Sequence, residues 1–213
     1  TFHNVPETVG LLAGTLADDA AFPDGQRGLV HDGVFDEVGA VLEIVRIEGG
    51  SNNGMNVTVN GGSTANVFST GFNSQIIGAY VADNAGVINL ADNSNMNLYD
   101  GLTLIGNAAN NGFAGNSGGV IQVNSGTFNM YGSTIIGQKA ENGGAVIVNA
   151  TGTFNMYGGL IKDGSAIWGG NIAVNGGTAN ISGGIIEGGY TDGDTYGGGN
   201  IYVQNSGNVT ISG

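Results

Sequence analysis

The most regular feature of the chain is an alternation of apolar and polar residues that recurs along its second part. In the segment GTFNMYG (126–132), Phe128 and Met130 alternate with Thr127, Asn129 and Tyr131. Successive side chains of a β-strand face opposite sides. The pattern therefore predicts a strand with one apolar and one polar face.

This alternation belongs to a repeat. GVIQVNSGTFNMYGSTIIG (119–137) resembles the segments at 145–164, 171–189 and 200–213, and two looser copies lie at 56–68 and 86–101. One aligned apolar position recurs every 25 to 33 residues, at Val59, Leu90, Val123, Val148, Val174 and Val203. A second follows each of these seven or eight residues later, at Val67, Leu98, Met130, Met156, Ile181 and Ile211. Periods of this length indicate a solenoid or a propeller.

Each copy predicts three short strands, because a third apolar segment contains Ile135, Ile161 and Ile186 in successive copies. Strands this narrow bury their apolar faces only by stacking on equivalent strands. The expected fold is all-β: a right-handed parallel β-helix of about six coils. The coils are longer and less even than those of a left-handed β-helix, and the repeat does not predict the antiparallel hairpins that the blades of a propeller need.

The stacking also predicts which residues become neighbours. Phe128 is expected to stack on Phe154 inside the solenoid, in a file with Ala65, Met96, Ala179 and Val209. Met130 should stack on Met156 in the same way. On the outside, Lys162 should lie beside Glu187.

Composition divides the chain near residue 49. Residues 1–48 contain six of the 43 glycines, a single Asn, nine acids and two bases. Residues 49–213 hold the other glycines and are rich in Asn. We interpret 1–48 as a cap or subunit-interaction segment, in which Val38 to Ile47 fits either a strand or an amphipathic helix, and 49–213 as the solenoid.

Charge and composition narrow the classes of function. The net charge of -13 disfavours binding to nucleic acid or to anionic membrane surfaces. No apolar run approaches the roughly 20 residues of a membrane span. The absence of cysteine suits an extracellular bacterial protein.

The repeat, of the form G-G-x-ϕ-x-V-N-x-G-T-F-x-M-x-G-G-x-I, resembles the pectate-lyase-like parallel β-helix repeats of bacterial cell-surface proteins and autotransporter-passenger adhesins. The resemblance covers about residues 55 to 213. It implies a fold more than a function, because the same architecture serves enzymes, adhesins and fibres.

The enzymes among these β-helix proteins allow a test of whether this chain is catalytic. Their lyases use a basic residue and Ca²⁺ held by acids, whereas this chain has four Lys and Arg residues in all. Their hydrolases gather several Asp near a His, whereas His3 and His31 lie outside the repeats. We expect no catalytic residues and no cofactor, although Glu187, Asp192 and Asp194 are close enough in sequence to approach one another.

Asp192 and Asp194 in TDGDT are the best metal candidates, and they would suit Ca²⁺ because alternate carboxylates can wrap a hard cation. The spacing lacks the pattern of an EF-hand. A solvated polar loop is the favoured interpretation.

Asparagines follow the last apolar residue of the first strand in most copies. Asn tolerates the left-handed backbone of a sharp bend and can hydrogen-bond to its equivalent one coil away. This predicts a structural ladder of Asn60, Asn124, Asn149 and Asn175, with Ala91 interrupting it and Gln204 in the same place later. An outward Asn file and a row of Tyr99, Tyr131 and Tyr157 should lie beside the second strands. The row would either stabilise the sheet or bind glycans.

Coil length varies after the third strand, so the connections back to the next coil should gather along one side. They contain the candidate ligand residues Tyr80, Phe113, Trp168, Tyr190 and Tyr196. Loops on a rigid scaffold often carry binding. The alternative is that these aromatic side chains fold back to cover the core.

Two functions remain in view. The first is an extracellular structural solenoid, at the bacterial cell surface, that assembles head to tail into a homopolymeric filament or layer. Since the last repeat lacks a third strand after Ile211, either the natural chain continues past Gly213 or a second subunit covers this coil, and we favour the second. The expected assembly residues are Val38, Val41, Leu42, Ile44, Ile47, Val209 and Ile211. The second is an adhesin or glycan-binding segment that uses the return connections.

Overall fold

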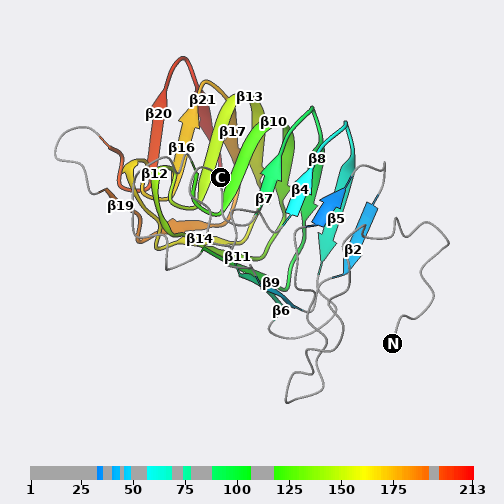
Figure 1. Cartoon of the computed structure of the whole chain (residues 1–213). Helices are drawn as coiled ribbons and strands as arrows, with labels where there is room; N and C mark the ends of the chain where they lie inside the picture. Colours follow the sequence, from blue (N-terminus) through cyan, green and yellow to red (C-terminus); the bar gives the residue numbers. More distant parts are fainter. Residues whose placement is uncertain are drawn as a thin grey trace.

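The computed structural model describes residues 33–35, 40–43, 46–48, 57–68, 74–77, 88–106, 118–191 and 197–213. These residues form strands and turns and no helix. Every pairing between the named strands is parallel. The fold is therefore a parallel β-solenoid, as the repeat predicts (Figure 1). In the described ranges no helix is long and apolar enough to cross a bilayer.

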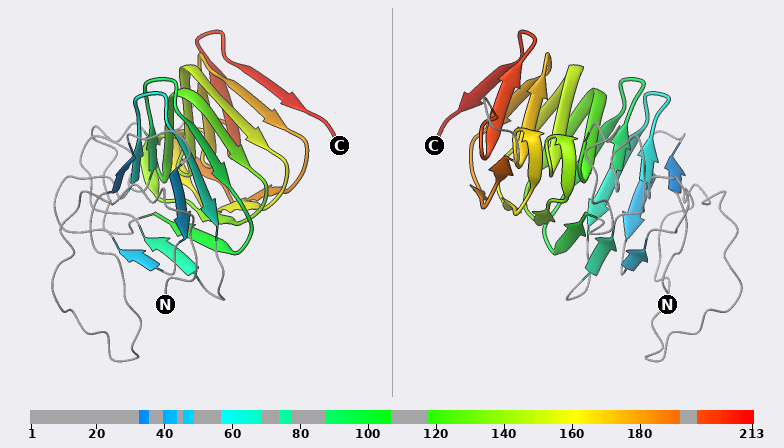
Figure 2. Two further views of the ribbon diagram at one scale, coloured as in Figure 1. Left: turned by 90° about the vertical axis from the view of Figure 1, so that its right-hand side faces the viewer. Right: turned by 60° about the vertical axis from the view of Figure 1, so that its left-hand side comes forward.

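The first two strands of each coil belong to one 12-stranded sheet. The first strands are β1 (Gly33–Phe35), β4 (Val57–Val59), β7 (Ile88–Leu90), β10 (Ile121–Met130), β13 (Val146–Met156), β16 (Ile172–Asn175) and β20 (Ile201–Gln204). The second strands are β2 (Ala40–Glu43), β5 (Thr64–Phe68), β8 (Asn95–Leu98), β17 (Thr178–Ile181) and β21 (Asn208–Ile211). In β10 and β13 the two expected strands continue as one. Figure 2 shows these coils stacked in sequence order along the solenoid.

The third strands form a separate six-stranded sheet. They are β3 (Arg46–Glu48), β6 (Ser74–Ile77), β9 (Leu102–Ile105), β11 (Thr134–Ile136), β14 (Leu160–Lys162) and β18 (Ile185–Glu187). Ile135, Ile161 and Ile186 are in register on neighbouring strands, as expected.

A third sheet was not expected. It consists of β12 (Lys139–Asn142), β15 (Ser165–Trp168) and β19 (Tyr190–Thr191). In these coils the segment after the third strand is thus a paired strand, whereas the sequence predicted a loop. Ala140 and Ala166 are fully buried in this sheet. Such small residues give a weak apolar signal over four residues, which explains why the pattern was missed.

The predicted register of the core is confirmed. Phe128 pairs with Phe154 and Met130 with Met156, and all four side chains are fully buried. The two phenyl rings stack with centroids 5.3 Å apart and planes 15° apart. Ala65, Met96, Ala179 and Val209 continue the Phe file in the neighbouring coils.

Glycine is required at the bend inside β10. Gly126 has φ of +85°, and a Cβ there would lie 1.8 Å from the backbone oxygen of Ser94 on the preceding coil. No side chain fits such a contact without moving the backbone. At this bend the chain turns from the first strand position to the second, and its register with β13 shifts between Val123 and Ser125.

The stacking extends upstream of the change in composition. β1, β2 and β3 pair in parallel with β4, β5 and β6 respectively. Residues of the segment 1–48 therefore add a further coil to the same sheets. Val41 and Leu42 lie in β2 and Ile47 in β3, so these expected assembly residues lie on strands that pair within the chain. Val38 and Ile44 lie outside the described residues.

Candidate functional site

The outer face of the second strands carries a stack of three tyrosines. Tyr99, Tyr131 and Tyr157 follow β8, β10 and β13 at equivalent positions, and ladder hydrogen bonds fix their backbones. The Tyr131 N–H donates to the Leu98 carbonyl at 2.9 Å, and the Tyr157 N–H donates to the Met130 carbonyl at 2.8 Å. Their positions are thus set by the sheet itself.

The rings of this tyrosine row are nearly parallel. The Tyr99 and Tyr131 centroids lie 5.1 Å apart and those of Tyr131 and Tyr157 lie 5.0 Å apart, with 11° between the planes in both pairs. The residues are 40%, 43% and 50% exposed respectively. Tyr131 is therefore stacked on both faces, and Tyr99 and Tyr157 are each stacked on the face turned toward Tyr131. Sugar rings bind aromatic side chains through open ring faces, so this geometry favours stability over glycan binding for the row.

A ladder of asparagines runs beside the tyrosines. Each side-chain Nδ2 donates to the Oδ1 of the Asn one coil earlier, at 2.8 or 2.9 Å. The members are Asn66, Asn97, Asn129, Asn155 and Asn180. These amides satisfy one another along the solenoid, which makes the ladder a structural feature.

The predicted ladder at the bend after the first strands is present with a different membership. Asn124, Asn149 and Asn175 are joined in sequence by Nδ2 to Oδ1 hydrogen bonds of 2.8 and 3.3 Å. The row continues to Asn89 before them, at 2.8 Å, and to Asn205 after them, at 2.6 Å.

The structure thus adds two residues that the sequence did not predict. Ala91 has no amide at its position, and Asn89, two residues earlier on the chain, extends the row instead. Asn205 supplies the amide at the other end, although Gln204 is the residue in register with Asn175. Asn60 lies one coil before Ala91 in the same register, directly after β4.

A hydrogen-bonded asparagine pair, in which Asn171 is buried and Asn200 is exposed, was missed. The Asn171 side chain is fully buried. Its Oδ1 accepts from the Gly164 N–H at 2.8 Å, and its Nδ2 donates to the Glu187 carbonyl at 2.7 Å and to the Asn200 Oδ1 at 2.8 Å. The repeated GGNI at 169–172 and 198–201 was the available signal. This pair joins the start of the first strand to the return connection.

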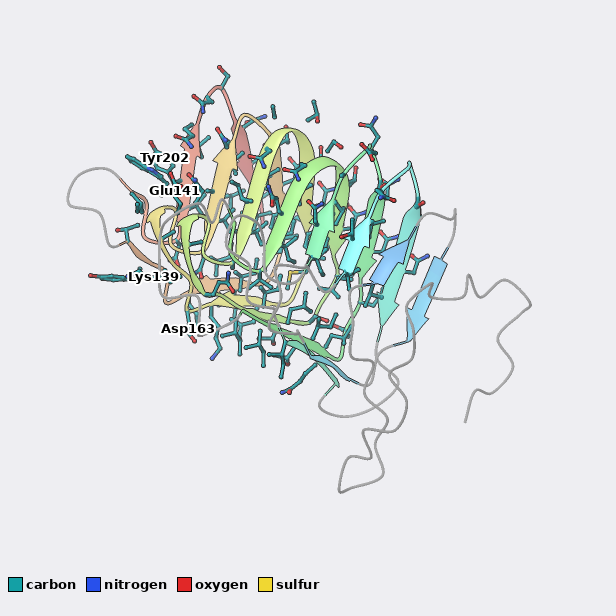
Figure 3. All side chains as sticks on the ribbon, in the orientation of Figure 1. Lys139, Glu141, Asp163 and Tyr202 are labelled. Atoms are coloured by element: carbon teal, nitrogen blue, oxygen red, sulfur yellow. The ribbon has the colours of Figure 1, made fainter. Side chains whose placement is uncertain are left out.

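The candidate ligand residues that are described lie on or near the third sheet. Trp168, in β15, is half-buried, and its ring packs on Tyr202 of β20 with centroids 5.2 Å apart at 32°. Tyr190, in β19, is 61% exposed. Tyr80, Phe113 and Tyr196 lie outside the described residues. Figure 3 shows Lys139, Glu141 and Tyr202 at the end of the solenoid that holds β12, β19 and β20.

Acidic groups are scattered in the described part of the chain. It holds no group of three or more His, Cys, Asp or Glu side chains able to share a metal ion. Asp192 and Asp194, the candidate calcium ligands, lie outside it, as do His3 and His31. Lys162 is in register with Glu187 as expected, but its Nζ pairs with Asp163 Oδ2 at 3.3 Å.

The coil that contains β20 and β21 has an uncovered apolar face. Val203 is 42% exposed and Ile211 is 69% exposed, whereas Val174 one coil earlier is fully buried and Ile181 is 8% exposed. Val209 is partly buried and packs against the core. The two strands pair only with β16 and β17 among the described strands.

Searches against family models, curated proteins and solved structures found no match to this chain. The strand pairings alone define its class, which is a parallel β-solenoid repeat protein.

Proposed function

We propose that the protein is an extracellular structural β-solenoid of a bacterial cell surface that assembles head to tail. The uncovered face of the β20–β21 coil carries this proposal. Val203 and Ile211 are exposed at positions that are buried in the coil before them. Covering such side chains is favourable by about 25 cal/mol per Å² of apolar surface.

The occupant we propose is the first coil of a second copy. Among the described strands, β1, β2 and β3 are each paired along one edge only. β1 and β2 belong to the same sheet as β20 and β21, and β3 belongs to the same sheet as β18. A coil of matching cross-section would extend the 12-stranded sheet with parallel hydrogen bonds. Repetition of such a heterologous contact generates a filament.

The side faces support a structural role as well. Both ring faces of Tyr131, one face each of Tyr99 and Tyr157, and the ladder amides contact their equivalents in neighbouring coils. A relationship to pectate-lyase-like or autotransporter β-helices is part of this proposal. The support for that relationship is the repeat pattern.

The test is the assembly of the full chain, followed by light scattering and electron microscopy as the concentration rises. Ile211→Asp places a charge on the uncovered face and should reduce filament formation. Tyr157→Ser is the matched control, because Ser182 occupies the equivalent position one coil later and the side face should not matter. A wild-type chain that stays monomeric, or Ile211→Asp filaments like those of the wild type, would refute the proposal.

Glycan binding by the third sheet is the second candidate. Two observations favour it: the Trp168–Tyr202 pair is half-buried, and the exposed Tyr190 lies in β19, which pairs with the strand that contains Trp168. Trp168 is the single tryptophan of the chain, so its fluorescence reports directly on this site. A glycan whose addition shifts that emission, with the shift lost in Tyr202→Ala, would support this function. A glycan array without any binding would exclude the tested sugars.

A further inference from the structure

We propose that the row of Tyr99, Tyr131 and Tyr157 is an oxidative cross-linking site, at which Tyr131 couples to either neighbour and forms a dityrosine bond between adjacent coils. This inference concerns a covalent modification and does not depend on head-to-tail assembly.

The geometry brings the reacting rings together before any oxidation occurs. The rings are stacked 5.1 and 5.0 Å apart at 11°, and the residues occupy equivalent positions on in-register strands. With nearly parallel planes and centroids 5.1 and 5.0 Å apart, the stack holds each phenol beside the ring with which it would couple. A held arrangement of this kind converts a bimolecular coupling into an intramolecular one.

The tyrosine row is accessible to solvent, and the next coil has no tyrosine at the equivalent position. At 40–50% exposure the phenols can be reached by an oxidant in solution. Ser182 occupies the equivalent position in the next coil, where its N–H donates to the Met156 carbonyl. Coupling along this face is thereby confined to two adjacent pairs, which share Tyr131.

A covalent link between coils would supply what the composition lacks. The chain contains no cysteine, so no disulfide can join its coils. Cross-links stabilise folded chains largely by restricting the unfolded state. A dityrosine between Tyr131 and Tyr157 would close the chain across one coil in the same way.

The step requires an oxidant, and we assign that role to a peroxidase with hydrogen peroxide. Each of two tyrosines loses one electron and its hydroxyl proton, which gives two phenoxyl radicals with spin on the ortho carbons. The radicals join in a carbon–carbon bond, and the two ortho hydrogens then move to the oxygens to restore both phenols. One hydrogen peroxide takes up the two electrons and two protons and leaves as two waters.

The chain contains a matched control. Tyr190 is more exposed than any tyrosine of the row, at 61%, and in the described part of the chain its ring contacts no other aromatic ring. If exposure decided reactivity, Tyr190 would react first, and it would form bonds between chains. If stacking decides it, Tyr190→Phe should leave the intrachain product unchanged.

The experiment treats the dilute full chain with peroxidase and hydrogen peroxide and maps the product by trypsin digestion and mass spectrometry. Trypsin cleaves after Arg46, Lys139 and Lys162. A Tyr131–Tyr157 bond therefore joins the peptides 47–139 and 140–162 with the loss of two hydrogens. A Tyr99–Tyr131 bond stays inside 47–139.

We expect the joined peptides at a yield independent of protein concentration. Tyr131→Phe should abolish both intrachain products while keeping the stacked rings and the fold, and Tyr99→Phe should keep the joined peptides. Oxidation in a denaturant should also abolish them. Dityrosine found only between chains, an equal yield of joined peptides in denaturant, or unchanged intrachain dityrosine in Tyr131→Phe would overturn the proposal.

Discussion

Replacing Phe154 with Ala tests whether the stacked phenyl rings hold the coils together. Phe154 is fully buried, with Phe128 on one side at 5.3 Å and Ala179 in register on the other. Ala179 cannot move in to fill the space, because its strand, β17, is held in register between β13 and β21. The substitution should therefore leave a cavity.

The expected loss of unfolding free energy is about 3–5 kcal/mol, the range for a buried Phe→Ala change that leaves a cavity. About 0.5–1.5 kcal/mol of this belongs to the ring pair itself. A double-mutant cycle with Phe128→Ala should return a coupling energy of that smaller size, because either single substitution already removes the ring contact.

Denaturant unfolding followed by circular dichroism measures the total, and hydrogen exchange locates it. In a solenoid each coil contacts only its neighbours. Protection should thus fall in β10, β13 and β17 before it falls in β4. Tyr157→Phe is the control, since this half-exposed position should change stability by under about 0.5 kcal/mol. A loss below about 1 kcal/mol for Phe154→Ala, or an equal loss of protection in β4, would refute the reasoning.

Three further substitutions probe the bend, the buried amide and the surface charge. Gly126→Ala should destabilise by at least about 2 kcal/mol through backbone collision, whereas Gly61→Ala, also at positive φ but with nothing within 4 Å, should cost only about 1–2 kcal/mol in a denaturant titration. Asn171→Ala should cost about 1–3 kcal/mol, because the buried Gly164 N–H loses its acceptor, and the amide of Gly164 should exchange faster. Lys162→Ala should change stability by under about 1 kcal/mol, since its pair with Asp163 is exposed to solvent; a larger effect in thermal unfolding would contradict this.

The sequence by itself determined the solenoid and the register of its core. Each interior residue contacts its own equivalent one repeat away, so aligning the repeats is the same operation as stacking the coils. Alternation with period two then assigns each residue to the inside or the outside. This is why the pairings of Phe128 with Phe154 and of Met130 with Met156 followed from the repeat alone.

The tertiary structure decided what depends on the path of the chain between repeats. β12, β15 and β19 form a sheet because each begins three residues after the third strand of its coil, at equivalent positions of successive coils, and no local alternation marks them strongly. In the ladder at the bend, Asn89 and Asn205 make the hydrogen bonds in place of Ala91 and Gln204. Equivalent sequence positions do not fix which nearby amide reaches its neighbour.

The sequence also did not determine how the tyrosine rings are oriented. The spacing aligned Tyr99, Tyr131 and Tyr157 and left glycan binding and stability as alternatives. Their faces turn toward one another because strand spacing in a parallel sheet, about 4.8 Å, is close to a comfortable distance between stacked rings. That orientation, which depends on side-chain rotamers and not on residue order, stacks Tyr131 on both faces.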